Sequence, residues 1–501
     1  MKKLLALVLA MILLTGCTQQ SPGTLLPEDL NPDNPQTPTA APSVSTNYSL
    51  AYYPDRSLNP YSCTDYTNRV LFSLIYQGLF AVDSDYVASP ILCYTFSRSA
   101  DMRTWTFHLA DATFSDGTSV TADDVVASLT AAKGSAWYGN RLLHVTKITA
   151  SGNAVVLQLD TPYENLPLIL DIPIVKASEV GAASPLGTGP YRLDGDQLRR
   201  QAAWWCSAQL PVTLLTIPLV AATDEVHIRN SFESGSVGLV CADPGSKDYV
   251  DFRNDCELWD SENGLFVYMT TNKKSKIFEN EAIRKALTHA IDRDALVNTY
   301  YRGFARSATL PASPDFPYHN SKLAANYGYD PQKFADAVAG AQLQSNAVTI
   351  LVSTSDYYKR YVANAVADAL RKAGLSVTMK EVSAANLVSE LRWGTWDLFV
   401  GQTRLSANMD LSAFFVSGGA LNYGNLTDDA IYAMCKDSLA NTGNYYDLHK
   451  LVMESGRLCP ILFQSCAIYG KRGVAPELSP ARDNLFYYHL GRTLEDARVS
   501  A

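Results

Sequence analysis

The sequence has no excess of positive charge and no second long hydrophobic run. Its 501 residues include 41 Lys and Arg against 50 Asp and Glu, which gives a formal net charge of −9, and no basic block interrupts this balance. A nucleic-acid partner is therefore not expected. Beyond the extreme N-terminus, no segment is long and apolar enough to cross a bilayer as a helix.

Common catalytic and metal-binding patterns are also missing. The chain contains no G-x-S-x-G, H-E-x-x-H or P-loop pattern, and its seven histidines stand apart from one another along the sequence. No two cysteines have C-x-x-C spacing, which removes zinc-ribbon and thioredoxin-like sites from consideration. The sequence therefore predicts no enzyme, metal site or cofactor, while a catalytic triad assembled from distant residues is left open.

The N-terminus has the pattern of an export signal. Two lysines precede an unbroken apolar run, Leu4 to Leu14, which is too short for a mature transmembrane helix and is typical of a signal peptide. The L-T-G-C pattern that ends at Cys17 resembles a bacterial lipobox, in which the cysteine is lipidated. We expect a signal peptide over residues 1–16 and a lipid anchor on Cys17, at the extracytoplasmic face of a bacterial cell membrane. The alternative is an ordinary cleaved signal peptide.

Residues 17–46 are predicted to be a disordered linker. They are rich in Pro, Thr, Ser, Asn and Gln and contain almost no large apolar residue, so they cannot bury enough surface to fold. A coil of this length holds a folded body on the order of 30 Å from its anchor. The remaining chain of about 450 residues is too large for a single core, so we expect two or three domains.

The cysteines other than Cys17 leave two possibilities open. An exported, oxidising location permits disulfides, but eight cysteines allow 105 pairings and the sequence does not choose among them. Buried free thiols are the alternative. The eight residues are Cys63, Cys93, Cys206, Cys241, Cys256, Cys435, Cys459 and Cys466.

The stretch F-S-D-G-T-S-V-T-A-D-D-V-V-A-S-L (114–129) looks at first like a metal or catalytic site. Local chemistry explains it more simply: Thr121 and Asp124 have the spacing of a helix capping box, and the Asp116-Gly117 pair suits a tight turn. The spacing does not match an EF-hand loop. We therefore predict a strand, a turn and a helix start here, without bound metal.

The same stretch is similar to a segment that identifies the extracellular solute-binding proteins of family five, the peptide- and nickel-type receptors of ABC importers. Four further segments resemble that family in the same order along the chain, and together the five cover it from about residue 47 to its end. The segments are residues 58–79, 106–129, 187–191, 231–240 and 277–297.

The resemblance implies an α/β fold of the two-lobed, periplasmic-binding-protein-like type II class. It places lobe I at about 47–269, with an inserted subdomain near 63–160, and lobe II at about 270–470. Residues 471–501 would return to lobe I.

The residues of the second half give a consistent pattern on their own. Runs with strand character at 348–352, 375–382 and 396–401 alternate with helical patterns at 357–373 and 384–391. This order predicts a mostly parallel α/β lobe. Ligands of such sheets bind beyond the carboxyl ends of the strands, which points to Ser353–Ser355 and Gly401–Arg404.

The residues after the last of these strands carry the ligand hypothesis. In peptide-binding family members the matching strand ends in Gly-Trp, and three residues later an aspartate pairs with the ligand's α-amino group; here Gln402 and Leu405 stand at those positions. Gln402, Thr403 and Arg404 are candidate ligand contacts, and Arg404 suits an anionic or carboxylate group. Two alternatives are open: Arg404 pairs with Asp410, or Asp410 supplies the missing acid through a shifted loop.

The loop Cys63–Thr67 of the first lobe faces the cleft, according to the resemblance. Tyr66 and Asp65 are therefore candidate ligand contacts. For Asp65, capping of the following helix is an equally simple explanation, because a carboxylate at a helix start needs no ligand.

These observations predict a lipid-anchored solute receptor, a monomer, which closes on a peptide or peptide-like ligand and docks on an ABC permease. Other ligands open to the same fold are nickel chelates, sugars and other anionic solutes. An exported hydrolase and a sensory lipoprotein are the alternatives from other classes.

The capping-box interpretation predicts that Asp124→Ala costs about 1 kcal/mol of stability, because one helix cap is lost. Chemical denaturation measures this cost. Ligand affinity is expected to stay nearly unchanged, and a selective loss of binding in a folded variant would contradict the interpretation.

Overall fold

The computed structural model describes residues 48–485, except 211, 213, 245–248, 250, 251, 254, 473–477, 479 and 483. The predicted signal peptide, Cys17 and the linker lie outside the described residues, as does most of the predicted C-terminal return. Within the described part, no helix has the length and apolar character needed to cross a membrane.

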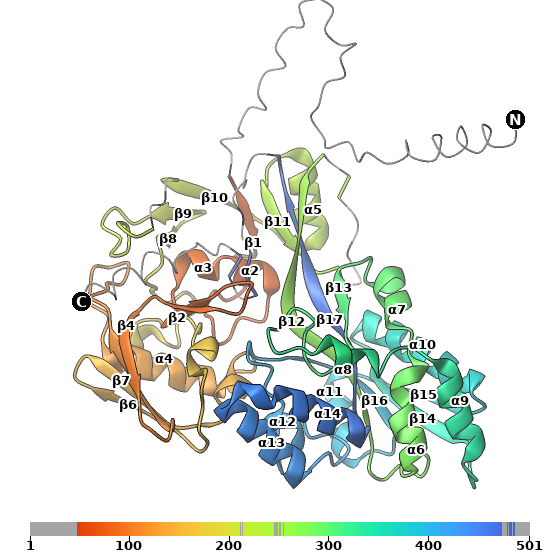
Figure 1. The fold of residues 1–501 in the computed structure, drawn as a ribbon. Helices are drawn as coiled ribbons and strands as arrows, with labels where there is room; N and C mark the ends of the chain where they lie inside the picture. Colours follow the sequence, from red (N-terminus) through yellow and green to blue (C-terminus); the bar gives the residue numbers. More distant parts are fainter. Residues whose placement is uncertain are drawn as a thin grey trace, which may run out of the picture. The chain divides into compact units, whose positions relative to one another are not determined.

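A large mixed sheet is built around two long strands, β12 (Glu257–Thr271) and β17 (Leu458–Gly470). They pair antiparallel and lie side by side through the middle of the sheet (Figure 1). On one side the sheet continues through β11 (Leu239–Ala242), β1 (Leu50–Tyr52), β10 (Thr216–Ala221), β9 (Gln197–Arg200) and β8 (Tyr191–Asp194). On the other side it continues through β16 (Leu398–Arg404), β14 (Ala347–Ser353) and β15 (Ser376–Val382), while β13 (Ala305–Ser307) pairs with β17.

The register of the β12–β17 pair shifts at two points, one between Glu262 and Leu265 and one between Val267 and Tyr268, and the first of them separates the two halves of the sheet. At this first bulge, Gly264 has a φ of 74°, a left-handed conformation that favours glycine. On one side of this bulge β17 pairs with both β12 and β11; on the other side β12 pairs with both β17 and β16. Each long strand therefore belongs to both halves of the sheet, and the bulge marks where they meet.

The predicted alternation of strands and helices in the second half is confirmed. Strand β14 is followed by α10 (Tyr357–Lys372), β15, α11 (Ala384–Trp393) and β16, and β14 pairs in parallel with both β15 and β16. The other helices of this half are α6 (Glu281–Ala286), α7 (Arg293–Tyr300), α8 (Ser321–Ala325), α9 (Pro331–Gly340), α12 (Ser412–Phe415), α13 (Asp429–Ala440) and α14 (Tyr445–Ser455).

A separate antiparallel sheet forms within the range predicted for the inserted subdomain. Its order is β4 (Cys93–Arg98), β5 (Thr104–Leu109), β7 (Ala154–Leu159) and β6 (Val145–Ser151), and α4 (Ala122–Gly134) contacts β6 and β7. The remaining elements of the first half are the pair β2 (Phe80–Val82) and β3 (Ala88–Pro90), and the helices α2 (Tyr66–Val70), α3 (Phe72–Ile75) and α5 (Glu225–Ser234). The lobe boundaries drawn from the sequence stay predictions.

The capping box at the start of α4 is confirmed. The Thr121 side chain accepts from the Asp124 backbone N–H, and the Asp124 carboxylate accepts from the Thr121 N–H at 2.9 Å. Asp124 also accepts from the backbone of Ala177 at 2.7 Å, so it joins α4 to a second segment. Asp116 forms the expected turn and an ion pair with Lys176 at 2.5 Å. Within the described residues, no group of three or more possible metal ligands occurs here or elsewhere.

The cysteines from Cys63 onward are free thiols, so the structure agrees with the possibility of free thiols and not with that of disulfides.

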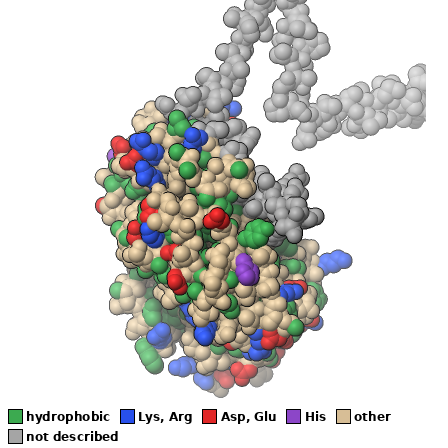
Figure 2. Space-filling model, turned by 90° about the vertical axis from the view of Figure 1, so that its left-hand side faces the viewer, with side chains coloured by type: hydrophobic (Ala, Val, Ile, Leu, Met, Phe, Trp, Pro, Cys, Tyr) green, Lys and Arg blue, Asp and Glu red, His purple; other side chains and the backbone are tan. Residues whose placement is uncertain are grey.

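Charges are mixed on the face shown in Figure 2, where basic and acidic side chains are interspersed. Each half has its own apolar cores: one large cluster lies between α4 and the four-stranded sheet, and another packs α10 against β14 and β16.

One buried histidine packs beside the Tyr445 ring, with 5.7 Å between the ring centroids. His449 on α14 is 0 % exposed, and within the described residues neither of its ring nitrogens has a hydrogen-bond partner. Burial, together with nearby His319, lowers the pKa of His449 to about 3 from an ordinary 6.5. Below about pH 6.5 the unfolded chain therefore binds a proton at this histidine, whereas the folded chain binds it only near pH 3. The free energy of unfolding decreases as the pH falls from about 6.5 to about 3.

Replacing this histidine should flatten the acid side of the stability curve. In wild type, His449 makes the free energy of unfolding depend on pH with a slope that approaches about 1.4 kcal/mol per pH unit, the value for one proton. His449→Leu removes this contribution. Urea denaturation between about pH 6.5 and pH 4.5 measures it, and the exposed His108→Gln serves as the control. An unchanged slope in His449→Leu would show that another group governs acid unfolding.

Candidate functional site

A cavity of about 500 Å³ lies between the two halves of the described body. Its first-half wall comes from the loop before α2, the start of α5 and the end of β11; Ser355, Asp356 and Tyr357 close it from the second half. These three residues follow the carboxyl end of β14, the position that the rule for parallel sheets indicated. The sequence analysis named Ser355 there, but not Asp356 or Tyr357.

Tyr66 is one of the residues that line this cavity, and its role as a ligand contact stays a prediction. It is the first residue of α2, and its hydroxyl lies 2.7 Å from the Cys466 Sγ on β17. Burial raises the pKa of Tyr66 well above its ordinary value, so the hydroxyl stays neutral. The ring therefore joins the first-half helix to a strand shared by both halves.

Tyr66 also lines a second cavity, of about 100 Å³, together with Cys241, Ser261 and Cys466. The Cys241 thiol is held neutral, because its contact with Cys466 and burial both raise its pKa. Tyr66 and Cys241, which line both cavities, are thus uncharged polar groups.

Asp65 also lines the larger cavity, but helix capping already occupies its carboxylate. It accepts from the Asn68 backbone N–H at 3.0 Å and forms an ion pair with Arg56. The capping alternative is therefore sufficient to explain this residue, and a ligand role stays a prediction.

The cavity wall carries more acidic than basic side chains. Asp356 caps α10 and pairs with Lys359 at 2.9 Å, and Asp224 caps α5 through the His227 N–H at 2.8 Å. The carboxylates on the wall are Asp65, Asp224, Glu225, Asp243 and Asp356, and the guanidinium groups are Arg56 and Arg229. Such a wall favours a ligand that presents an amino group or other hydrogen-bond donors.

The candidates on β16 lie apart from this wall. Gln402, Thr403 and Arg404 pair with β12 and are not among the described residues that line either cavity. The Arg404 guanidinium lies 4.6 Å from the centre of the Trp137 ring, which comes from the first half, and donates to the Arg482 carbonyl at 3.1 Å. Arg404 therefore takes part in a stacked contact between the two halves. Its predicted role in selecting an anionic ligand stays a hypothesis.

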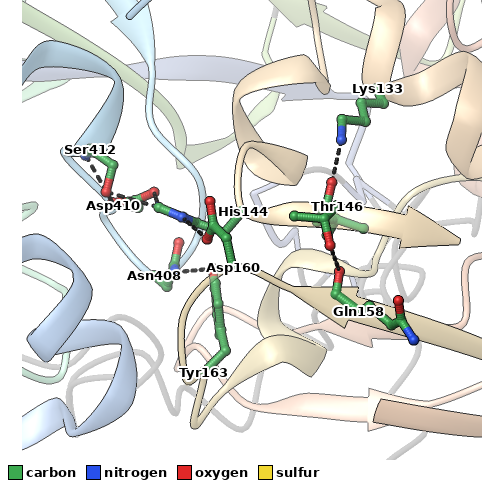
Figure 3. Close-up of polar contacts among 10 residues, drawn as sticks. Lys133, His144, Thr146, Gln158, Asp160, Tyr163, Asn408, Asp410 and Ser412 are labelled. Carbon is green, nitrogen blue, oxygen red and sulfur yellow. Dashed lines mark hydrogen bonds and ion pairs between the residues drawn. The ribbon is translucent and has the colours of Figure 1, made fainter. Parts of the chain in front are cut away.

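Asp410 makes a different contact between the halves. Its Oδ1 accepts from the backbone N–H of Ser412 at 2.9 Å, and its Oδ2 lies 3.6 Å from the His144 Nε2 (Figure 3). Asp410 is not the partner of Arg404 in any described contact; it belongs with His144 of the subdomain. The sequence analysis set the histidines aside as isolated, and it held no signal for this contact because 268 residues separate His144 from Ser412.

The contacts of His144 have the order of a catalytic triad. Its Nδ1 lies 2.8 Å from the Asp160 Oδ1, and its Nε2 lies 3.0 Å from the Ser412 Oγ. However, Ser412 is 0 % exposed, and its hydroxyl donates to Asp410 at 2.7 Å instead of facing a substrate site. None of the three residues lines a described cavity. We interpret the group as a contact that holds two parts of the fold together.

Comparison with known proteins places the chain in a family. Residues 88–422 match the model of the bacterial extracellular solute-binding proteins, family 5 middle region. The glutathione-binding protein GsiB of Escherichia coli (strain K12) is 26 % identical over 322 residues, which are 60 % of this chain and 62 % of the relative. The chain thus spans less than two thirds of the length of that curated relative.

Solved structures share the fold. NikA from Brucella suis in complex with Fe(III)-EDTA has a TM-score of 0.68 at 20 % identity, covering 89 % of this chain and 98 % of NikA. A putative peptide-binding protein AppA from Clostridium difficile has a TM-score of 0.73 at 14 % identity, covering 88 % and 98 %. The predicted α/β, two-lobed periplasmic-binding-protein-like fold is confirmed. The chain belongs to the bacterial extracellular solute-binding proteins of family 5.

Proposed function

We propose that this protein is an extracytoplasmic receptor that captures a small solute, a peptide or peptide-like molecule, and delivers it to an ABC permease. The observation that carries the proposal is the cavity of about 500 Å³ with walls from both halves of a family 5 fold. A ligand held there contacts both halves at once, so its binding energy favours the closed form. No chemical step is needed.

The cavity wall supports a ligand with an amino group. Among the described residues that line it, carboxylates outnumber guanidinium groups, and Tyr66 contributes a neutral hydroxyl. A short peptide presents both an amine and hydrogen-bonding amides, and the relative GsiB is named for glutathione, itself a small peptide-like solute. Nickel chelates and sugars are the competing ligands, and the proposed anchor is a lipid on Cys17.

Filling the cavity tests the proposed site. Ser355→Trp places an indole at its rim, where Ser355 is exposed, and should abolish ligand-induced thermal stabilisation without lowering the melting temperature of the free protein. The probes are tri- to pentapeptides, reduced glutathione, Ni(II)–histidine and common sugars. Ser389→Trp, at an exposed serine of α11, is the matched control.

The outcomes separate the hypotheses. Stabilisation by a probe in wild type and in Ser389→Trp, but not in Ser355→Trp, supports a receptor with its site in this cavity. Equal stabilisation of all three proteins would place the site elsewhere. Turnover of a probe, lost in Ser412→Ala, would support the hydrolase alternative.

Arg404 provides a separate test of ligand charge. If its guanidinium selects a carboxylate, Arg404→Ala should weaken a carboxylate-bearing probe about 10-fold or more, whereas Arg404→Lys retains part of the affinity through its charge. Isothermal titration measures both. Unchanged affinity in Arg404→Ala would show that Arg404 does not select the charge of the ligand.

A further inference from the structure

His144 lies at the boundary between the inserted subdomain and the second half of the chain. It directly precedes β6, and its side chain is 3 % exposed between Asp160 of the subdomain and the loop Asn408–Ser412 (Figure 3). Asn408 of this loop also donates to the Tyr163 hydroxyl at 2.5 Å. Three residues of this loop, Asn408, Asp410 and Ser412, therefore make polar contacts with the first half of the chain.

Counting hydrogens shows which form of the imidazole this contact needs. Ionised Asp160 only accepts, so the His144 Nδ1 carries a hydrogen. The single hydrogen of the Ser412 hydroxyl is donated to Asp410 at 2.7 Å, so the hydroxyl oxygen is left to accept from the His144 Nε2 at 3.0 Å. Both ring nitrogens then carry hydrogens, and the imidazolium satisfies every contact. A neutral ring would break the Ser412–Asp410 hydrogen bond or face an oxygen without a hydrogen between them.

The electrostatics agree with this count. Burial disfavours the charged ring, but the contacts with Asp410 and Asp160 outweigh burial and raise the pKa of His144 above its ordinary 6.5. Burial also favours a neutral Asp410, yet its contacts with His144 and Ser412 lower the pKa of its carboxyl. The closed contact thus holds a charged pair, with nitrogen and oxygen 3.6 Å apart, away from water.

The tyrosine and cysteine side chains around this contact stay neutral near neutral pH. Burial is the first cause that raises the pKa of Tyr163, Tyr432, Cys435 and Tyr445. The Tyr432 ring stacks on His144 with 6.4 Å between centroids, and the Lys436 ammonium lies 4.6 Å from the centre of the Tyr432 ring. Among the facing groups, His144 is the one whose ordinary titration falls between about pH 5 and pH 8.

We propose that His144 is a proton-binding site that links protonation to closure of the two lobes, with the imidazolium joining Asp160 to Asp410 and Ser412 across the boundary. In this proposal Asp160 moves with His144, and the contact with Asp410 and Ser412, which come from the second half of the chain, is broken when the lobes open. Proton binding and closure therefore favour each other.

The sign of the pH effect follows from this linkage. The closed form holds its proton to a higher pH than an open form that lacks Asp410, so acid favours closure. The stabilisation is complete below about pH 6.5, the ordinary histidine value, and is lost as the pH rises through the raised pKa of His144. If the proposed receptor function holds, ligands are retained more tightly under mildly acidic conditions than under alkaline ones.

The test of the contact measures the His144 titration directly in the full folded chain. NMR of histidine-labelled protein should show one resonance with a pKa above 6.5, which disappears in His144→Gln and shifts to lower pKa in Asp410→Asn and Ser412→Ala. His108→Gln, an exposed histidine of the same subdomain, is the matched control and should leave that resonance unchanged. A pKa that neither Asp410→Asn nor Ser412→Ala alters would overturn the proposal.

The test of closure needs no ligand, so its result is independent of the receptor assignment. Small-angle scattering should give a radius of gyration that increases from pH 5.5 to pH 8.5 in wild type and in His108→Gln. His144→Gln and Ser412→Ala should lose this pH response. A wild-type radius that does not change with pH, or a response that persists in both variants, would show that protonation of His144 does not drive closure.

Discussion

The pairing of β12 with β17 is the constraint on which the rest of the structure depends. Both strands extend through the two halves, and every neighbouring strand of the large sheet takes its position from them. The bulge before Leu265, with Gly264 at a positive φ, is where this pair changes partners. We expect a change in the relative angle of the two halves to be absorbed at this irregular segment, because fewer ladder hydrogen bonds fix the backbone there.

The boundary between the halves has both apolar and polar contacts. Val82 and Leu168 of the first half form a small buried cluster with Ala407 of the second half. Hydrogen bonds and stacked rings bridge the boundary as well. Arg404 on Trp137, Asn408 on Tyr163 and His144 on Ser412 are examples. Water can replace these polar contacts at modest cost when the halves separate, because their groups are polar.

Local chemistry explains what could be predicted from the sequence. The capping box at Thr121, the strand–helix alternation after residue 347 and the position of Tyr66 depend on short-range patterns or on a resemblance that covers them. The place of Arg404 and Asp410 depends on partners from the first half, and nothing near them in the sequence indicates Trp137 or His144. Contacts between residues hundreds of positions apart are set by how sheets pair, and periodicity along one segment carries no information about them.

The central pair of strands also affects how the chain is made. Strand β17 begins at Leu458, so the large sheet lacks one of its two middle strands until most of the polypeptide has been synthesised. Strands that lie far apart in the sequence pair slowly, because the chain between them loses conformational entropy before any contact between the strands stabilises the pair. The growing chain therefore stays incompletely folded through most of translation. A polypeptide in that state can still be threaded through a membrane before its last strand completes the sheet.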